Sequence, residues 1–261
     1  MVLNNLKRGE SIDKNSPVPM YYQIMSQLRE MILEGEYAVN SLLPPERELV
    51  EMYQVSRMTI RQAILELVNE GILVRRKGVG TFIAPPKLEQ PLSSLTSFTE
   101  DMAQRGMKAG ARIISFKETL PDPTTRKTLE LSAEDTVFEC VRLRLADEEP
   151  MALETTMLVA SICPGLQADD LENQSLYKVL AERCNIELDY ATQSLEPIFA
   201  PPYEAALLHV APGAPLLFMH RVTYDQSGRA FERVKSLYRG DRYKFVTELR
   251  RQAGRRPPLR K

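Results

Sequence analysis

The sequence predicts an α+β protein built from two domains, a small helical unit closed by a hairpin and a larger unit with an antiparallel sheet. Helix-like segments and one hairpin fill residues 17–84, and strand-like segments joined by polar turns dominate residues 92–249. Between them, a short, stiff, proline-rich linker is predicted at residues 85–91. A chain of 261 residues is long enough for two domains that each bury a core.

The amino-terminal domain is predicted to contain three helices and a hairpin. Residues 1–16 are polar and aperiodic, so we expect them to be disordered. Apolar residues then recur at helical spacing in three segments, and Ser56 is suited to cap the third. The helices are expected over residues 19–35, 46–53 and 56–70, and the hairpin over residues 72–83. This order of elements is that of a winged helix-turn-helix, a DNA-binding unit.

One face of the third expected helix is suited to DNA. Arg57 and Arg61 lie one turn apart, opposite the apolar positions, and arginine can bind guanine O6 and N7 bidentately in the major groove. A solvated helix surface is the alternative explanation of such charges. Three consecutive basic residues that end at Lys77, in a turn with Gly78 and Gly80, favour DNA binding. The glycines let the backbone approach a phosphate or the minor groove closely.

Charge is distributed unevenly along a chain whose net charge is −1. Residues 1–86 carry ten basic and ten acidic side chains, whereas residues 87–249 carry 18 basic and 25 acidic ones. Phosphate would repel an acidic second domain, which confines DNA contact to the first domain. The last twelve residues, 250–261, hold six basic and no acidic side chains and are predicted to form a disordered basic tail.

The second domain mixes strands with helices. Polar turns at residues 147–150 and 225–228 separate apolar segments and imply antiparallel hairpins. Strands are expected over residues 112–119, 137–146, 151–159, 188–199, 216–224, 230–238 and 243–249. Helices are expected over residues 95–105, 124–131, 176–184 and 203–209.

An internal repeat relates two parts of this domain. A shift of 78 residues places Asp147 on Asp225 and Glu154 on Glu232, with few other identities. Each copy runs helix, turn, strand, polar turn, strand. The repeat therefore predicts two hairpins related by a pseudo-two-fold axis in one sheet, with the two glutamates at equivalent places.

Arg142 and Arg144 are candidate ligands for an anion. They alternate along an expected strand, so both side chains point to one face of the sheet. Neighbouring guanidinium groups repel each other unless an anion or carboxylates neutralise them, and their planar donors suit phosphate or carboxylate. The alternative is an ion-pair network with Glu154 and Glu232. These two glutamates and Tyr238 are also candidates for binding hydroxyl groups, the alternative being ordinary solvent exposure.

The sequence contains no pattern typical of catalysis, of a resident metal or of a cofactor. It has only two histidines and lacks nucleophile-elbow, zinc-protease and phosphate-loop motifs. The cysteines, at positions 140, 163 and 184, have no CxxC spacing and are predicted to be reduced thiols. No apolar stretch is long enough for a membrane span or a signal peptide, so we expect a cytoplasmic protein.

Residues 17–84 resemble the winged helix-turn-helix of the GntR family of bacterial repressors. Turn, recognition helix and wing occur in order in LPPERELVEMYQVSRMTIRQAILELVNEGILVRRKGVGTFIA. The resemblance implies a phosphate contact for Arg47, positions in or beside the major groove for Ser56, Arg57, Thr59 and Arg61, and a wing tip made by Lys77, Gly78 and Gly80. It also implies a homodimer on a palindromic operator of double-stranded DNA.

Residues 92–249 resemble the effector domain of the HutC subfamily, whose fold is similar to chorismate lyase. The segments ECVRLRLADEEPMALETTML and RVTYDQSGRAFERVKSLYRGDRYKF carry the resemblance. Within the subfamily the likeness is to repressors of N-acetylglucosamine utilisation, which respond to amino-sugar phosphates. It implies a phosphate held by Thr99, Arg142, Arg144 and Ser175, with Tyr177 nearby, and a sugar held by Glu154, Glu232 and Tyr238.

Together, the two resemblances imply a homodimeric repressor of genes for amino-sugar uptake and catabolism. Its expected effector is N-acetylglucosamine-6-phosphate or glucosamine-6-phosphate, and the linker at 85–91 is the expected transmitter, because a stiff connection passes on rigid-body motion. Two alternatives stay open. One is the same regulator with another metabolite, such as an amino-acid degradation product, and the other is a lyase-like enzyme fused to a DNA-binding module.

Overall fold

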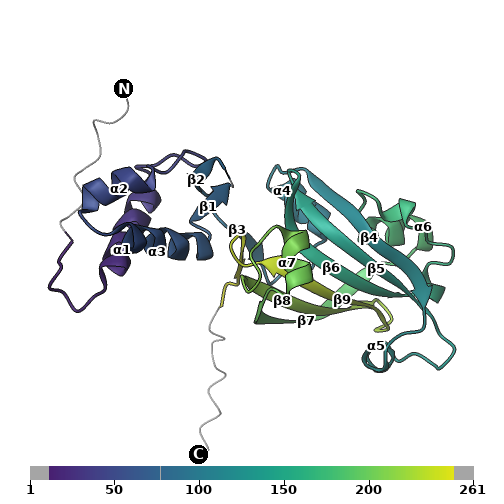
Figure 1. The fold of residues 1–261 in the computed structure, drawn as a ribbon. Coiled ribbons are helices and arrows are strands. Elements are labelled where there is room, and N and C mark those ends of the chain that lie inside the picture. The colour runs from purple at the N-terminus through teal and green to yellow at the C-terminus, as the bar shows by residue number, and fades with distance from the viewer. Residues whose placement is uncertain (1–11, 77, 250–261) are drawn as a thin grey trace, which may run out of the picture.

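The computed structural model describes residues 12–76 and 78–249, and it contains the two units expected from the sequence (Figure 1). The amino-terminal unit has three helices and a two-stranded antiparallel hairpin. They are α1 (Met20–Leu33), α2 (Glu46–Tyr53), α3 (Arg57–Asn69), β1 (Leu73–Arg76) and β2 (Gly80–Ile83). The predicted winged helix-turn-helix is therefore confirmed, with every element close to its expected bounds.

One apolar core holds the three helices together. Ile24 and Leu28 of α1, Leu49 of α2, and Ile60 and Leu67 of α3 are all fully buried in it. On α3 the buried positions follow the helical repeat, so they occupy one face and leave the opposite face to solvent. This packing orients the candidate DNA-binding face of α3 outward.

Residues 12–16 are ordered against α1, although the sequence predicts disorder up to residue 16. The Asp13 amide donates to Gln23 Oε1 (3.0 Å), and Gln23 Nε2 donates back to the Asp13 carbonyl oxygen (3.0 Å). Ile12 also packs against the domain core. The sequence of residues 12–16 does not reveal these contacts, because their partner is a side chain of the following helix. Residues 1–11, Lys77 and the basic tail at 250–261 lie outside the described residues.

The second unit is built on a six-stranded antiparallel sheet whose strand order is β4-β5-β6-β9-β8-β7. A second sheet of two strands pairs β3 with β10. The elements are β3 (Leu88–Pro91), α4 (Phe98–Gln104), β4 (Ala109–Thr119), α5 (Pro123–Thr128), β5 (Val137–Ala146), β6 (Glu149–Val159), two short 3-10 turns (Ala160–Ile162 and Asp169–Leu171), α6 (Leu176–Cys184), β7 (Leu188–Phe199), α7 (Pro202–Leu208), β8 (Pro215–Asp225), β9 (Ala230–Arg239) and β10 (Tyr243–Val246). The α+β class predicted from the sequence is thus confirmed.

Helices cover both faces of the large sheet (Figure 1). Leu143 and Leu153 point to the face packed by α7, whereas Cys140 and Leu158 point to the face packed by α6. Successive side chains of a strand alternate between the two faces. Arg142 therefore lies on the same face as Cys140, beneath the layer formed by α4 and α6.

The 78-residue repeat is a repeat of structure. The run β4-α5-β5-β6 corresponds to β7-α7-β8-β9, and the two copies meet where β6 pairs with β9. Thr156 is paired with Val234, which lies 78 residues further along, so the pseudo-two-fold axis passes through this pair. Glu154 and Glu232 lie on the two central strands, as the repeat predicts. The structure also adds a first strand to each copy.

The predicted linker at 85–91 is in part a strand, which corrects the sequence-based expectation. Residues Leu88–Pro91 form β3 and pair in parallel with Tyr243–Val246 of β10. Only residues 85–87 remain as an unpaired connection. Proline-rich composition indicates a linker locally, but it cannot reveal a strand partner near the other end of the domain.

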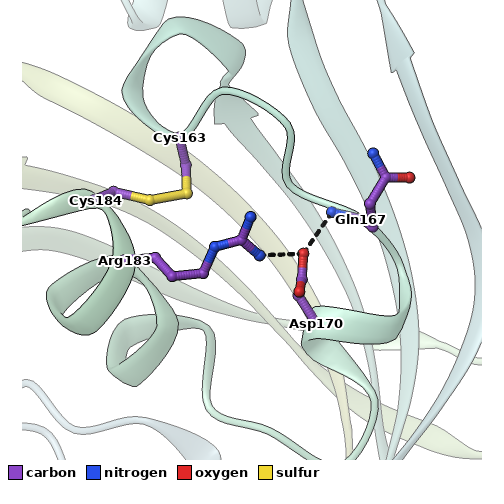
Figure 2. Close-up of a disulfide and its surroundings, with 5 residues drawn as sticks. All are labelled: Cys163, Gln167, Asp170, Arg183 and Cys184. Carbon is purple, nitrogen blue, oxygen red and sulfur yellow. Dashed lines mark hydrogen bonds and ion pairs between the residues drawn. A yellow bond between two sulfur atoms is a disulfide. The ribbon is translucent and has the colours of Figure 1, made fainter.

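Cys163 and Cys184 form a disulfide, which corrects the prediction that all three cysteines are reduced thiols (Figure 2). The bond ties the loop after β6 to the last residue of α6, with 5.4 Å between the two Cα atoms. Arg183 and Asp170 form an ion pair beside it. Cys140 is a buried free thiol. Sequence spacing misleads here, because the two cysteines are 21 residues apart and only the packing of α6 brings them together.

Reduction of this disulfide is expected to lower the free energy of unfolding by about 3 kcal/mol, because the open chain regains the entropy of a loop of this length. Urea denaturation with and without dithiothreitol measures the change. Cys163→Ser should show the lower stability in both conditions, and Cys140→Ser should respond to dithiothreitol as the wild type does. Equal stability in both conditions for the wild type would argue against the bond.

Candidate functional site

The exposed arginines of α2 and α3 lie near acidic partners on the same surface. The side chains of Arg57 and Arg61 are 74% and 54% exposed, and both approach Glu46 at the start of α2, at 2.9 and 3.9 Å. Arg47 is 87% exposed and lies 3.5 Å from Glu51. Exposed ion pairs of this kind contribute little stability. Their arginines can therefore exchange a carboxylate for a DNA phosphate or base at small cost.

The start of α3 is organised by two of the predicted DNA-binding residues. Ser56 caps the helix, since its Oγ accepts a hydrogen bond from the Thr59 amide (3.2 Å) and lies 2.8 Å from Thr59 Oγ1. Both hydroxyls remain at the exposed helix terminus. A capped, exposed terminus suits phosphate, because amide dipoles and hydroxyls point outward there.

The wing is a tight turn between β1 and β2. Gly78 and Gly80 have φ angles of 75° and 150°, which side-chain-bearing residues rarely adopt. Arg76 stacks on the ring of Phe82 at 4.5 Å, which holds one basic side chain of the wing against the hairpin. Lys77, predicted at the wing tip, lies outside the described residues.

A small cavity lies in the second unit, between the large sheet, α4, α6 and the β3–β10 pair. Six of the predicted ligand-binding residues line it: Arg142, Arg144, Glu154, Tyr177, Glu232 and Tyr238. The space in it that water-sized groups can reach is about 30 Å³, which is room for roughly one or two of them. The polar side chains that line it are therefore packed almost against one another.

One carboxylate is paired with both arginines, which leaves the three groups with a net positive charge. Glu154 Oε1 lies 2.6 Å from Arg142 Nη2 and 3.1 Å from Arg144 Nη2. Burial alone would raise the pKa of Glu154, but Arg144 and Arg142 hold that pKa at about 2, so the carboxylate is ionised. Arg142 is only 1% exposed, and its Nε and Nη1 have no hydrogen-bond partner among the described residues. Two buried cations thus share one anion and keep unused donors.

Glu232 does not join the arginines, although the repeat makes it the counterpart of Glu154. Its Oε2 accepts hydrogen bonds from Tyr177 Oη (3.0 Å) and Thr223 Oγ1 (2.8 Å). Burial raises the pKa of Glu232, and the nearby charge of Glu154 raises it further. The ion-pair alternative drawn from the sequence therefore holds for Glu154 and is wrong for Glu232.

The two glutamates are expected to affect stability with opposite signs. Glu154→Gln breaks a buried ion pair and should lower the free energy of unfolding by about 3 kcal/mol or more. Glu232→Gln should raise the free energy of unfolding.

The effect of Glu232→Gln should depend on pH. A group with a raised pKa contributes stability below its unfolded pKa of about 4.3 and loses it as pH rises. The stabilisation by Glu232→Gln should therefore be larger at about pH 8 than at about pH 5. Urea denaturation at both pH values checks this, and a fall in stability for Glu232→Gln at the higher pH would contradict it.

Sequence reasoning missed ten of the sixteen residues that line the cavity. The missed lining residues are Gln90, Thr96, Ser97, Phe98, Asp101, Leu176, Met219, Arg221, Val234 and Phe245. Arg221 adds a third guanidinium group. The capping box from Ser97 to Glu100 is visible in the sequence and marks the start of α4. No local signal shows that this helix start lies over Arg144, whose guanidinium carbon is 5.5 Å from the Phe98 ring centre.

Two predicted phosphate ligands lie beside the cavity and not on its wall. Thr99 follows the lining residue Phe98 in α4. Ser175 is buried and caps α6, since its Oγ accepts a hydrogen bond from the Lys178 amide (3.4 Å). Their contact with a ligand stays a prediction.

A winged helix-turn-helix joined to a domain with a buried, arginine-lined cavity defines a ligand-controlled DNA-binding regulator. The model of the bacterial regulatory proteins of the gntR family matches residues 20–83, and that of the UTRA domain matches residues 104–244. The chain belongs to the GntR family and carries a UTRA domain of the HutC type. It is a DNA-binding transcription repressor controlled by a small-molecule effector.

Relatives with the same organisation span nearly the whole chain. The HTH-type transcriptional repressor NagR of Bacillus subtilis is 44% identical over 236 residues, which is 90% of this chain and 97% of NagR. The histidine utilization repressor of Pseudomonas aeruginosa is 30% identical over 230 residues, 88% of this chain and 90% of the relative. The crystal structure of PhnF from Mycobacterium smegmatis superposes with a TM-score of 0.62 at 32% identity, covering 88% of this chain and all of PhnF.

Two further features of the described residues bear on function. Their helices include none with both the length and the apolar surface that crossing a membrane requires. Within the same residues, no three His, Cys, Asp or Glu side chains gather as a metal site would need. NagR and the Pseudomonas aeruginosa relative are both named as repressors.

Proposed function

We propose that this repressor is controlled by an amino-sugar phosphate, N-acetylglucosamine-6-phosphate or glucosamine-6-phosphate, and that it regulates amino-sugar uptake and catabolism. The observation that carries the proposal is the buried guanidinium of Arg142, which has two nitrogen donors without a partner among the described residues. Charged donors that are buried and unpaired are costly, and an anionic ligand with several oxygens would satisfy them. The sequence resemblance to repressors of N-acetylglucosamine utilisation selects the sugar.

The phosphate would bind at Arg142 and Arg144, with Thr99 and Ser175 at its edge and Tyr177 nearby. Glu154, Glu232 and Tyr238 would then accept or donate hydrogen bonds to the sugar. The mixture of cations with acceptors supports this division, because a phosphate needs donors whereas sugar hydroxyls need both donors and acceptors. A cavity lined only by arginines would instead suit a simple inorganic anion.

Binding requires the cavity to open. Its volume of about 30 Å³ is far below the ~300 Å³ or more of a typical small-molecule site. Glu154 now holds the position between the two arginines that the phosphate would take. We therefore expect the effector to displace the Glu154 carboxylate and to separate α4 and α6 from the sheet. A protein that opens in this way has the two states that effector control needs.

The same proposal includes a homodimer that works in the cytoplasm and does not turn over its ligand. A two-fold dimer matches a palindromic operator, since each wing and each α3 would read one half-site. The effector can change DNA affinity only by its differential affinity for the two states, typically by about 1–3 kcal/mol.

Fluorescence anisotropy on a palindromic operator of the family type tests the proposal. DNA binding is measured at fixed salt, because DNA affinity depends steeply on salt, with and without each sugar phosphate. The proposal would be supported if either sugar phosphate weakens operator binding and unphosphorylated N-acetylglucosamine does not. DNA binding that ignores both compounds would overturn the effector assignment and favour another metabolite. Consumption of either compound, followed by NMR, would point to the lyase-like alternative.

A further inference from the structure

The turn that follows α3, the helix with the candidate DNA-binding face, touches the second domain. Gly71, which follows the last residues of α3, is buried and has a φ of +76°. A Cβ atom at this position would overlap the backbone of Asp241, lying 2.7 Å from its Cα and 2.8 Å from its carbonyl carbon. Both the backbone conformation and the close approach therefore require glycine.

A second residue of the first part of the chain holds the same turn. Lys87 Nζ donates a hydrogen bond to the carbonyl oxygen of Gly240 (2.7 Å). Burial lowers the pKa of Lys87, while Asp241 and Glu70 favour its charged form. The turn at residues 239–242 is therefore contacted from two sides, by Gly71, two residues after α3, and by Lys87, the residue before β3.

Side-chain hydrogen bonds cross-link the turn and tie it to the start of β6. Arg239 donates to both carboxylate oxygens of Asp241 (3.0 and 2.7 Å), and also to Glu149 Oε1 and the Pro150 carbonyl oxygen (both 3.0 Å). Arg242 donates to the other Glu149 oxygen (2.8 Å). Arg239 is only 5% exposed, whereas the side chains of its partners Glu149 and Asp241 are 38% and 26% exposed. We therefore expect a movement at one end of the turn to move the other end as well.

On each side of the turn, a nearby residue lines the cavity. Tyr238, immediately before it, and Phe245, three residues after it, are lining residues. Their rings pack edge to face with centroids 5.6 Å apart, and Tyr243 lies against Tyr238 at 4.7 Å. The two rings belong to β9 and β10, the strands that the turn connects.

We propose that the turn at residues 239–242 is the element that couples the effector cavity to DNA binding, through its contact with Gly71. This inference rests on the effector control proposed above. It replaces the expectation that the linker alone transmits the signal, because residues 88–91 of that linker are locked into β3. A ligand that moves Tyr238 or Phe245 shifts the turn, and the turn shifts the end of α3 and with it the angle of the recognition surface.

Gly71→Ala tests the contact, and Gly35→Ala is its matched control. Gly35 also follows a helix with positive φ (+81°), but a Cβ there meets nothing within 4 Å. Both variants carry the same kind of backbone strain, and only Gly71→Ala disturbs the domain contact. In the control, effector should change DNA affinity by the wild-type factor, typically about 5–150-fold. In Gly71→Ala this factor should fall below about twofold, whereas effector affinity without DNA, measured by calorimetry, stays within about twofold of wild type.

A variant without backbone strain and a readout without effector complete the test. Lys87→Met should also reduce the factor by which effector changes DNA affinity. In hydrogen–deuterium exchange of the free protein, peptides covering residues 239–242 should exchange faster in Gly71→Ala than in wild type or Gly35→Ala. A Gly71→Ala protein that keeps the wild-type response and exchange pattern overturns the coupling proposal. A wild type that ignores both sugar phosphates overturns the effector assignment instead, and the exchange result still decides whether the contact exists.

Discussion

Replacing Arg142 and Arg144 together by methionine, in a chain that also carries Glu154→Gln, is expected to abolish the effector response without weakening DNA binding. Each charged hydrogen bond contributes about 1.5–3 kcal/mol, so losing both arginines should weaken effector binding by roughly 100-fold or more. The third substitution is needed because Glu154 would otherwise remain as an unpaired buried charge, which costs about 3–5 kcal/mol. Calorimetry with the sugar phosphate measures the affinity, and anisotropy on operator DNA measures the response.

Two controls make this result specific to the cavity. Arg112→Met removes an exposed arginine of β4 and should bind effector as the wild type does. Glu154→Gln alone keeps both arginines and removes their internal anion, so it should retain measurable affinity for the phosphate group. An effector that still releases the triple variant from DNA at wild-type concentrations would place the ligand elsewhere.

Arg57→Ala and Arg61→Ala are each expected to weaken operator binding by about 10–100-fold, because a bidentate arginine–guanine contact is worth roughly 1–3 kcal/mol. Neither residue contributes to the domain core, and both side chains are more than half exposed. The folded state and effector affinity should therefore be unchanged. Anisotropy on the operator and on a scrambled duplex of equal length measures both specific and non-specific binding.

The scrambled duplex separates two roles for each arginine. If an arginine reads a base, its alanine variant loses affinity for the operator alone. If it binds a phosphate, the variant loses affinity for both duplexes, and its DNA binding depends less on salt. Arg112→Ala serves as the control for a general loss of positive charge. Unchanged operator binding in both α3 variants would contradict the assignment of this face of α3 to DNA.

The sequence alone predicted the class of fold and much of the site. Helical spacing located α1, α2 and α3 closely, because each helix forms hydrogen bonds and an apolar face within a few neighbouring residues. Strand alternation placed Arg142 and Arg144 on one face for the same local reason. The 78-residue repeat predicted the central pairing of two hairpins, although it implied equal surroundings for Glu154 and Glu232.

Contacts between distant segments escaped prediction. Glu154 faces arginines on β5, whereas Glu232 faces Tyr177 of α6 and Thr223 of β8. Identical residues at equivalent positions of a repeat therefore acquire opposite pKa shifts, because the neighbouring strands differ. The third arginine of the cavity, Arg221, carried no local signal at all.

Periodicity, capping residues and turn glycines are properties of short stretches of chain, and through them the sequence by itself determined a DNA-binding domain, a sheet domain and a pair of arginines on one face of the sheet. Tertiary structure alone decided that Cys163 reaches Cys184, that part of the linker becomes β3, and that Gly71 rests on Asp241. The physical reason is that burial, ion pairing and backbone contact depend on which remote segments meet. That meeting is set by the packing of the whole sheet and its helices.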